Sequence, residues 1–116
     1  MPGALRSLTT IEGRTTMPRK VPFATPGDIL LHDFLEPMGI TQYRLAKEIG
    51  VPQRRIGEVV AGRRSITADT ALRLAAFFGT DAQSWINLQS HFDTETARGS
   101  MEETLSRIRR WDALAA

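Results

Sequence analysis

Two short helices joined by a tight turn are predicted between residues 41 and 60, and this stretch constrains the fold more than any other. The predicted helices are Gln42 to Ile49 and Gln53 to Val60, and in both the apolar residues recur at helical spacing. These apolar residues are Leu45, Ala46, Ile49, Ile56, Val59 and Val60. Gly50 stands where a helix end requires a residue that tolerates a positive φ. The pattern therefore predicts a helical hairpin.

The spacing of five residues within this hairpin resembles the helix-turn-helix of the phage-repressor-like DNA-binding family. They are Gln42, Ala46, Gly50, Val51 and Ile56. Ala46 is small enough for the second helix to cross closely, and Val51 fills the corner between the helices. An ordinary pair of antiparallel helices needs only apolar periodicity and a glycine. It does not need all five positions together with Arg54 and Arg55 on the exposed face.

The charge distribution supports a nucleic-acid partner. The net charge of the chain is only +2, but residues 41–73 carry seven basic and three acidic side chains. The basic ones are Arg44, Lys47, Arg54, Arg55, Arg63, Arg64 and Arg73. Residues 21–40, in contrast, hold three acids and no Lys or Arg. Positive charge concentrated on one element is the electrostatic footprint expected of a protein that binds phosphates.

The other motifs predict an all-α fold, a five-helix domain that contains the hairpin plus an additional C-terminal helix. Thr25 and Thr67 are predicted N-caps, with Pro26, Asp28 and Asp69 in the first turns that follow. Pro37 and Gly39 are predicted to end the first helix, and Gly79 the one that starts after Thr67. The core face of that later helix is expected to comprise Ala71, Leu72, Leu74, Ala75 and Phe78. Thr80 and Gln83 form a predicted capping box for a helix that carries Trp85, Leu88 and Phe92 at helical spacing, with Trp85 expected in the core.

The two ends of the chain lie outside this predicted domain, which covers residues 25–92. Residues 1–24 are expected to form a flexible leader or arm that includes Arg19 and Lys20, and Met17 is an alternative start. Residues 93–116 are expected to form a linker, broken at Gly99, and an amphipathic helix capped by Ser100. Its apolar stripe is Met101, Leu105, Ile108, Trp111 and Ala115. Such a helix packs either on its own domain or on another chain.

Composition and motifs argue against an enzyme, a secreted protein and a membrane protein. The chain has no cysteine, which excludes disulfides, a thiol nucleophile and Cys-ligated zinc. His32 and His91 form no metal-spaced pair, and the glycines are not grouped in a phosphate-binding loop. No signal peptide or membrane-length apolar run is present. We expect a cytoplasmic protein without a catalytic site, metal or cofactor.

DNA binding assigns a role to specific side chains, because the second helix of such a hairpin lies in the major groove. The predicted base-reading residues are Gln53, Arg54, Gly57 and Glu58. Arg suits guanine and Gln suits adenine, whereas Glu58 either accepts from cytosine or orients a neighbouring Arg. The predicted phosphate contacts are Thr41, Gln42, Arg44, Arg55, Arg63, Arg64 and Ser65. These would position the protein without carrying sequence information.

Beyond the hairpin, the order of motifs resembles the HigA-type (VapI-like) antitoxins of the same superfamily. The resemblance covers about Pro26 to Gln89 and is carried by PGDILLHDFLEPMGITQYRLAKEIGVPQRRI, ITADTALRLAAFFGT and SWINLQ. It implies a homodimer that binds a palindromic operator of its own promoter, a double-stranded DNA. It also implies a partner toxin, a small HigB-like ribonuclease that cleaves mRNA. The leader and the C-terminal tail depart from the family pattern.

Two other hypotheses are compatible with the residues. A stand-alone transcriptional repressor would have the same DNA-binding domain and no toxin, and a neighbouring gene for a small basic protein would separate the two. A protein-interaction module that has lost DNA binding is the third. The arginines at positions 54, 55, 63 and 64 argue against it, because such a face has no reason to retain that charge.

Overall fold

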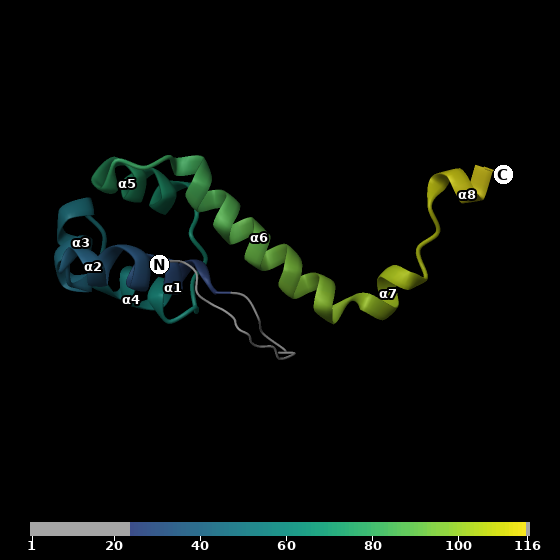
Figure 1. Ribbon diagram of the computed structural model, residues 1–116, viewed down its shortest axis with the longest axis horizontal. Coiled ribbons are helices and arrows are strands. Elements are labelled where there is room, and N and C mark those ends of the chain that lie inside the picture. Colours follow the sequence, from purple (N-terminus) through teal and green to yellow (C-terminus); the bar gives the residue numbers. More distant parts are fainter. Residues whose placement is uncertain (1–23, 116) are drawn as a thin grey trace.

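The computed structural model describes residues 24–115, and every regular element in this part of the chain is a helix (Figure 1). The predicted all-α class is therefore confirmed. The elements are α1 (Pro26–Ile29), η2 (Leu30–Leu35), α2 (Glu36–Met38), α3 (Gln42–Ile49), α4 (Gln53–Val60), α5 (Ala68–Phe78), α6 (Ala82–Ser100), α7 (Glu102–Ser106) and α8 (Trp111–Ala115). The predicted leader, with Met17, Arg19 and Lys20, lies outside the described residues except for Ala24.

The elements α1, η2 and α2 follow one another as a single helical rod. Thr25 begins it with a capping box, in which the Thr25 hydroxyl accepts from the Asp28 N–H at 3.0 Å and Asp28 accepts from the Thr25 N–H at 3.1 Å. The middle of the rod is π-helical, and the Glu36 N–H donates to the Leu31 carbonyl.

The prediction that Pro37 ends this helix is wrong, because Pro37 lies inside α2 and Gly39, at φ 67°, ends it. In a regular α-helix the ring of Pro37 would clash with the carbonyl four residues earlier. The π-helical segment η2 ends two residues before Pro37. Single π-helical turns are known to interrupt α-helices.

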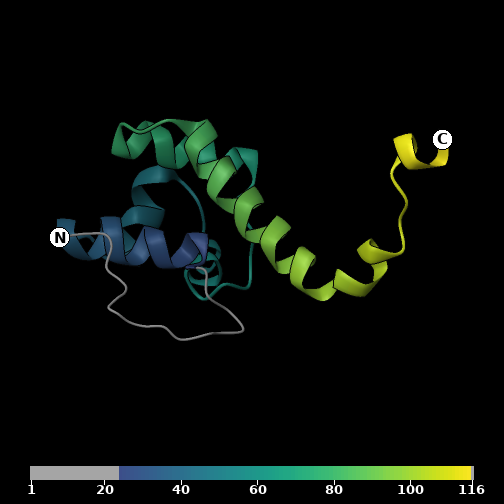
Figure 2. The same ribbon diagram turned by 45° about the vertical axis from the view of Figure 1, so that its right-hand side comes forward.

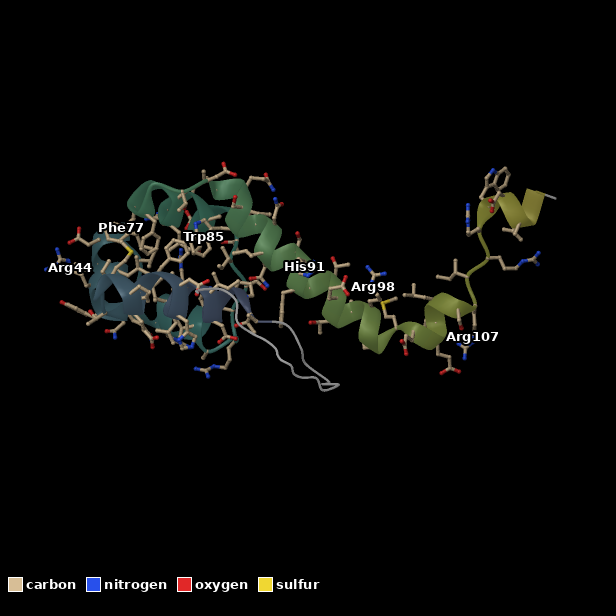
Figure 3. All side chains as sticks on the ribbon, viewed as in Figure 1. Arg44, Phe77, Trp85, His91, Arg98 and Arg107 are labelled. Carbon is tan, nitrogen blue, oxygen red and sulfur yellow. The ribbon has the colours of Figure 1, made fainter. Side chains whose placement is uncertain are left out.

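The core joins the rod, the hairpin, α5 and the start of α6. Its largest fully buried side chains are Leu30, Leu35, Leu45, Ile56, Leu74, Val59 and Thr70. The ring of Phe34 packs against Phe78 and Trp85, with its centroid 4.9 Å from that of Phe78 and 5.0 Å from that of Trp85. Trp85 is buried among these side chains (Figure 3), as predicted for a core residue. Leu72 does not belong to the core, since it is 62% exposed on the outer face of α5.

The predicted capping box of Thr80 and Gln83 is wrong. Asp81 caps α6, and its carboxylate accepts from the Ser84 N–H at 3.2 Å. The Thr80 hydroxyl instead accepts from the indole N–H of Trp85 at 2.8 Å. A buried indole N–H requires a hydrogen-bond acceptor, so this contact decides which of the two neighbouring residues becomes the cap.

The C-terminal part departs most from expectation, because α6 continues without a break through Gly99 to Ser100. It leaves the packed helices and carries α7 and α8 away from them (Figure 2). Ser100 is not an N-cap, since its hydroxyl donates to the Ala97 carbonyl. Two short helices replace the single amphipathic one. The predicted stripe is exposed at Met101, Leu105, Ile108 and Trp111, and the last of these is 79% exposed.

Candidate nucleic-acid interface

The hairpin is built from local capping contacts, and both helices have the predicted bounds. The Thr41 hydroxyl accepts from the Arg44 N–H at 3.0 Å and begins α3. Gly50 ends it at φ 74°, and the Val51 N–H donates to the Ala46 carbonyl at 3.0 Å. The side chain of Val51 is buried in the corner between the helices. These contacts hold α4 across α3 and leave its outer face exposed.

The four predicted base-reading residues lie on this outer face of α4, opposite the buried Ile56 and Val59. Gln53 and Arg54 are exposed at its start, and 85% of the Arg54 side chain is accessible. Gly57 and Glu58 lie one turn later and are half-buried. A helix that enters the major groove contacts bases with residues near its N-terminal end, which is where Gln53 and Arg54 stand.

Glu58 has a basic partner on each of its carboxylate oxygens. Oε2 accepts from Arg54 Nε at 3.0 Å, and Oε1 accepts from Arg64 Nε at 2.9 Å. The hydrogen bonds from Arg64 and then from Arg54 lower the pKa of Glu58, and their positive charges act in the same direction. Of the two roles predicted for Glu58, this geometry favours orientation of an arginine.

The predicted phosphate contacts flank α4 on two sides. Arg63, Arg64 and Ser65 are exposed in the loop after α4, and Thr41 and Arg44 are exposed at the start of α3. Figure 3 shows Arg44 at the end of the molecule opposite to the projecting α6. Exposed polar and basic side chains therefore lie on both sides of α4.

Two members of this set are less accessible than the others. Gln42 is half-buried, and its Oε1 lies 3.7 Å from the position that a Cβ on Gly57 would occupy. Arg55 is 29% exposed, and its guanidinium pairs with Asp69 of α5 at 2.8 Å. Arg55 is thus directed to α5.

Sequence reasoning missed the residue that holds the loop after α4. The buried Gln89 of α6 accepts from the Ile66 N–H at 2.8 Å and donates to Asp93 at 3.0 Å. Ile66 is itself buried and directly follows the exposed Ser65. No local sequence pattern predicts the contact between Ile66 and Gln89, which are 23 positions apart in the chain.

Gly27 is a second position whose role was missed. A Cβ on this buried residue would collide with the Val59 carbonyl oxygen and lie 2.9 Å from the Val60 Cα. Only glycine lets α1 approach the end of α4 this closely. The sequence gives no sign of this, because a glycine in the first turn of a helix also occurs without any such contact.

Other kinds of site find no support in the described residues. Within residues 24–115, no group of His, Asp and Glu side chains could hold a metal ion. Nor does this part of the chain contain a helix long and apolar enough to span a membrane.

Comparison with known proteins agrees with this geometry. The family described as Helix-turn-helix matches residues 31–85. Virulence-associated protein I of Dichelobacter nodosus is 49% identical over 78 residues, which cover 67% of this chain and 72% of that protein. Antitoxin HigA-1 of Vibrio cholerae is 36% identical over 77 residues, which cover 66% and 72%.

A solved structure extends the likeness to nearly a whole neighbour. It is the Pseudomonas aeruginosa antitoxin HigA with the higBA promoter, and it superposes with a TM-score of 0.73 at 34% identity. The match covers 76% of this chain and 97% of that one. About three quarters of this chain therefore has a structural counterpart in a protein solved together with promoter DNA.

Proposed function

The chain belongs to the HigA-type antitoxin family of helix-turn-helix proteins, whose members are DNA-binding regulators and not enzymes, and we propose that it represses its own operon and neutralises a HigB-like toxin. The observation that carries the proposal is the outer face of α4, where Gln53 and Arg54 are exposed and an exposed basic loop follows. The family neighbour solved with its promoter supports DNA as the ligand.

Arg54 is the proposed principal base reader. Its Nε donates to Glu58, so its two terminal amino groups remain for another partner. These two groups can donate together to guanine O6 and N7, a bidentate contact worth roughly 1–3 kcal/mol of discrimination. Glu58 then acts in base reading mainly through Arg54, and Gln53 is suited to adenine in the same groove.

We propose phosphate contacts on both sides of this helix. Arg63, Arg64 and Ser65 would meet one strand after α4, and Thr41, Gln42 and Arg44 the other at the start of α3. Such contacts fix the register of the protein on the duplex and make affinity depend on salt.

The operator is proposed to be palindromic and the protein a homodimer. A two-fold dimer places its recognition helices in successive major grooves, about 34–36 Å apart. The relative from Vibrio cholerae is named an antitoxin, which supports a toxin partner. The toxin is proposed to be a small HigB-like ribonuclease that cleaves mRNA, as the resemblance to HigA-type antitoxins implies.

Co-expression with the product of the adjacent gene tests the antitoxin role. A tagged chain should retain that product in a stoichiometric complex and relieve its toxicity. If no complex forms but the chain binds its own promoter fragment tightly, it is a stand-alone repressor. If neither binding is seen, the proposed function is wrong.

Two substitutions test the assigned DNA contacts. Arg54→Ala should lower discrimination at one base pair of each half-site, by about 1–3 kcal/mol. Arg63→Ala should weaken binding to every sequence and reduce the slope of log affinity against log salt by about 1. The measurement is fluorescence anisotropy with the promoter fragment and with single-base variants. A uniform loss in both variants would contradict the assignment.

A further inference from the structure

One polar cluster joins three helices at the start of α4. Asp69 and Arg73 lie one turn apart on α5. The same oxygen of Asp69, Oδ2, accepts from Arg55 Nη1 at 2.8 Å and from Arg73 Nε at 3.1 Å. Arg55 belongs to the first turn of α4, so the carboxylate of Asp69 links α5 to the recognition helix. Hydrogen bonds from Arg55 and then Arg73 lower the pKa of Asp69, which keeps the carboxylate charged.

Arg73 extends the cluster to the end of α3. Its Nη1 donates to the Ile49 carbonyl at 2.6 Å and to the Gly50 carbonyl at 3.4 Å. Ile49 is the last residue of α3 and Gly50 is its C-cap. Carbonyls at this end of a helix lack partners within the helix and carry partial negative charge, so a guanidinium is a favourable partner for them.

The start of α4 has few other polar contacts to fix it. Pro52 is its N-cap and provides no side-chain hydrogen bond. Apolar packing by Ile56 and Val59 begins one turn later. The orientation of the first turn, which carries Gln53 and Arg54, therefore depends on the turn after α3 and on Arg55. Arg73 and Asp69 hold these two places.

We propose that Asp69 and Arg73 are positioning residues for base reading, which fix the angle at which α4 presents Arg54 to the DNA. This inference rests on the proposed DNA-binding function and assigns to it two residues that would contact neither a base nor a phosphate. It also assigns Arg55 to the cluster and not to a phosphate. Exposed ion pairs stabilise a fold only slightly, so the effect of the cluster is expected mainly in geometry.

Arg73→Lys is the sharpest test, because it keeps the charge but replaces a planar fork by a single ammonium group. A lysine cannot reach Asp69 and both carbonyls with the same geometry. We expect the ratio of affinities for the promoter fragment and for a scrambled duplex to fall about tenfold, near the lower end of one bidentate contact. The salt slope should stay unchanged. Arg98→Lys is the matched control, since Arg98 pairs with Glu95 on the projecting α6.

The affinity ratio separates positioning from stability. Partial unfolding lowers the affinity for both duplexes by the same factor and leaves their ratio unchanged. A fall in the ratio, with binding to the scrambled duplex retained, therefore supports positioning. An unchanged ratio overturns it. Arg73→Gln, which removes the charge, tests the alternative: an equal loss of affinity for both duplexes together with a smaller salt slope identifies Arg73 as a phosphate contact instead.

A second variant tests whether the two residues act together. Asp69→Asn should also lower the ratio, and the double variant Asp69→Asn, Arg73→Lys should lower it by less than the product of the two single effects. Independent, multiplicative effects overturn the proposed cluster. If the unmodified chain binds neither duplex, the proposed DNA-binding function itself fails. This result is distinct from a variant that binds DNA with an unchanged affinity ratio.

Discussion

The hairpin region and the C-terminal region are both rich in arginine and both contain arginine pairs within one helical turn, but several arginines around the hairpin also join separate elements. Around the hairpin, Arg64 pairs with Glu58 and Arg55 with Asp69, and Arg73 reaches the end of α3. These contacts join separate elements. In the C-terminal region, Arg98 pairs with Glu95 and Arg107 with Glu103, within one helical turn. Such pairs stabilise a helix by a few tenths of a kcal/mol and do not fix its direction.

The apolar side chains show the same contrast. Leu45, Ala46, Ile49, Ile56 and Val59 of the hairpin are buried, whereas the large apolar side chains from Met101 to Leu114 are exposed and belong to no part of the core. Contacts between elements give the first region one defined geometry, which the proposed base reading would require. The second region has helical secondary structure, but its apolar residues remain outside the core that residues 24–115 form.

The largest difference in stability is expected when one leucine is substituted in each region. Leu45→Ala removes a fully buried side chain of α3 and should cost about 2–5 kcal/mol of unfolding free energy. Leu105→Ala, at a residue 41% exposed, should change stability by less than about 0.5 kcal/mol. Urea unfolding followed by circular dichroism measures both. Similar losses would mean that the C-terminal segment is packed in solution.

A pair of helical glycines gives the next largest effect. Gly27→Ala should destabilise by about 1–3 kcal/mol, because its Cβ meets the backbone of Val59 and Val60. Gly99→Ala meets nothing within 4 Å and should stabilise α6 by up to about 1 kcal/mol. Thermal unfolding of the two variants should therefore shift in opposite directions. A shift in the same direction would contradict either the close approach of α1 or the continuity of α6.

The smallest effect is expected from His32, which forms a local pair with Glu36 in the packed region. Its hydrogen bond with Glu36 raises the pKa of His32 above 6.5, although desolvation opposes this, and the charges of Glu36, Asp28 and Asp33 raise it further. The charged pair should therefore stabilise the fold below pH 6.5 and lose this contribution as pH rises through the raised pKa.

The contribution should remain below about 0.5 kcal/mol, because both side chains are exposed. Thermal unfolding of the unmodified chain and of His32→Gln between pH 5 and 8 measures it. The difference in stability between them should shrink as pH rises. A difference that grows with pH would show that the histidine pairs elsewhere.

The features that could be predicted from sequence are those set by neighbouring residues. Thr41, Thr67 and Gly50 act on backbone groups within a few positions, so the bounds of α3 and the start of α5 followed directly. The predicted division into a domain over residues 25–92 and a tail stays a prediction, as do the DNA contacts. The features that failed depend on side-chain contacts and helix packing that the local pattern does not specify.

Three wrong predictions and one contact that was not predicted illustrate this. The choice of Asp81 over Thr80 as cap is decided by the indole of Trp85, and the helical backbone at Gly99 is continuous with a long preceding helix. Leu72 has the correct periodicity for α5 but faces away from the rod and the hairpin. The contact of Arg73 with Ile49 joins residues that only the folded chain brings together.

The continuity of α6 has a consequence for cooperativity. Its first half holds Trp85 and Gln89, which are buried, whereas every residue from Thr96 to Ser100 is exposed. One unbroken helix therefore crosses from a part that opens only with global unfolding to a part that opens locally. Amide hydrogen exchange should slow steadily from Ser100 back towards Trp85, and the edge of the cooperative folding unit lies inside this helix and not at a loop.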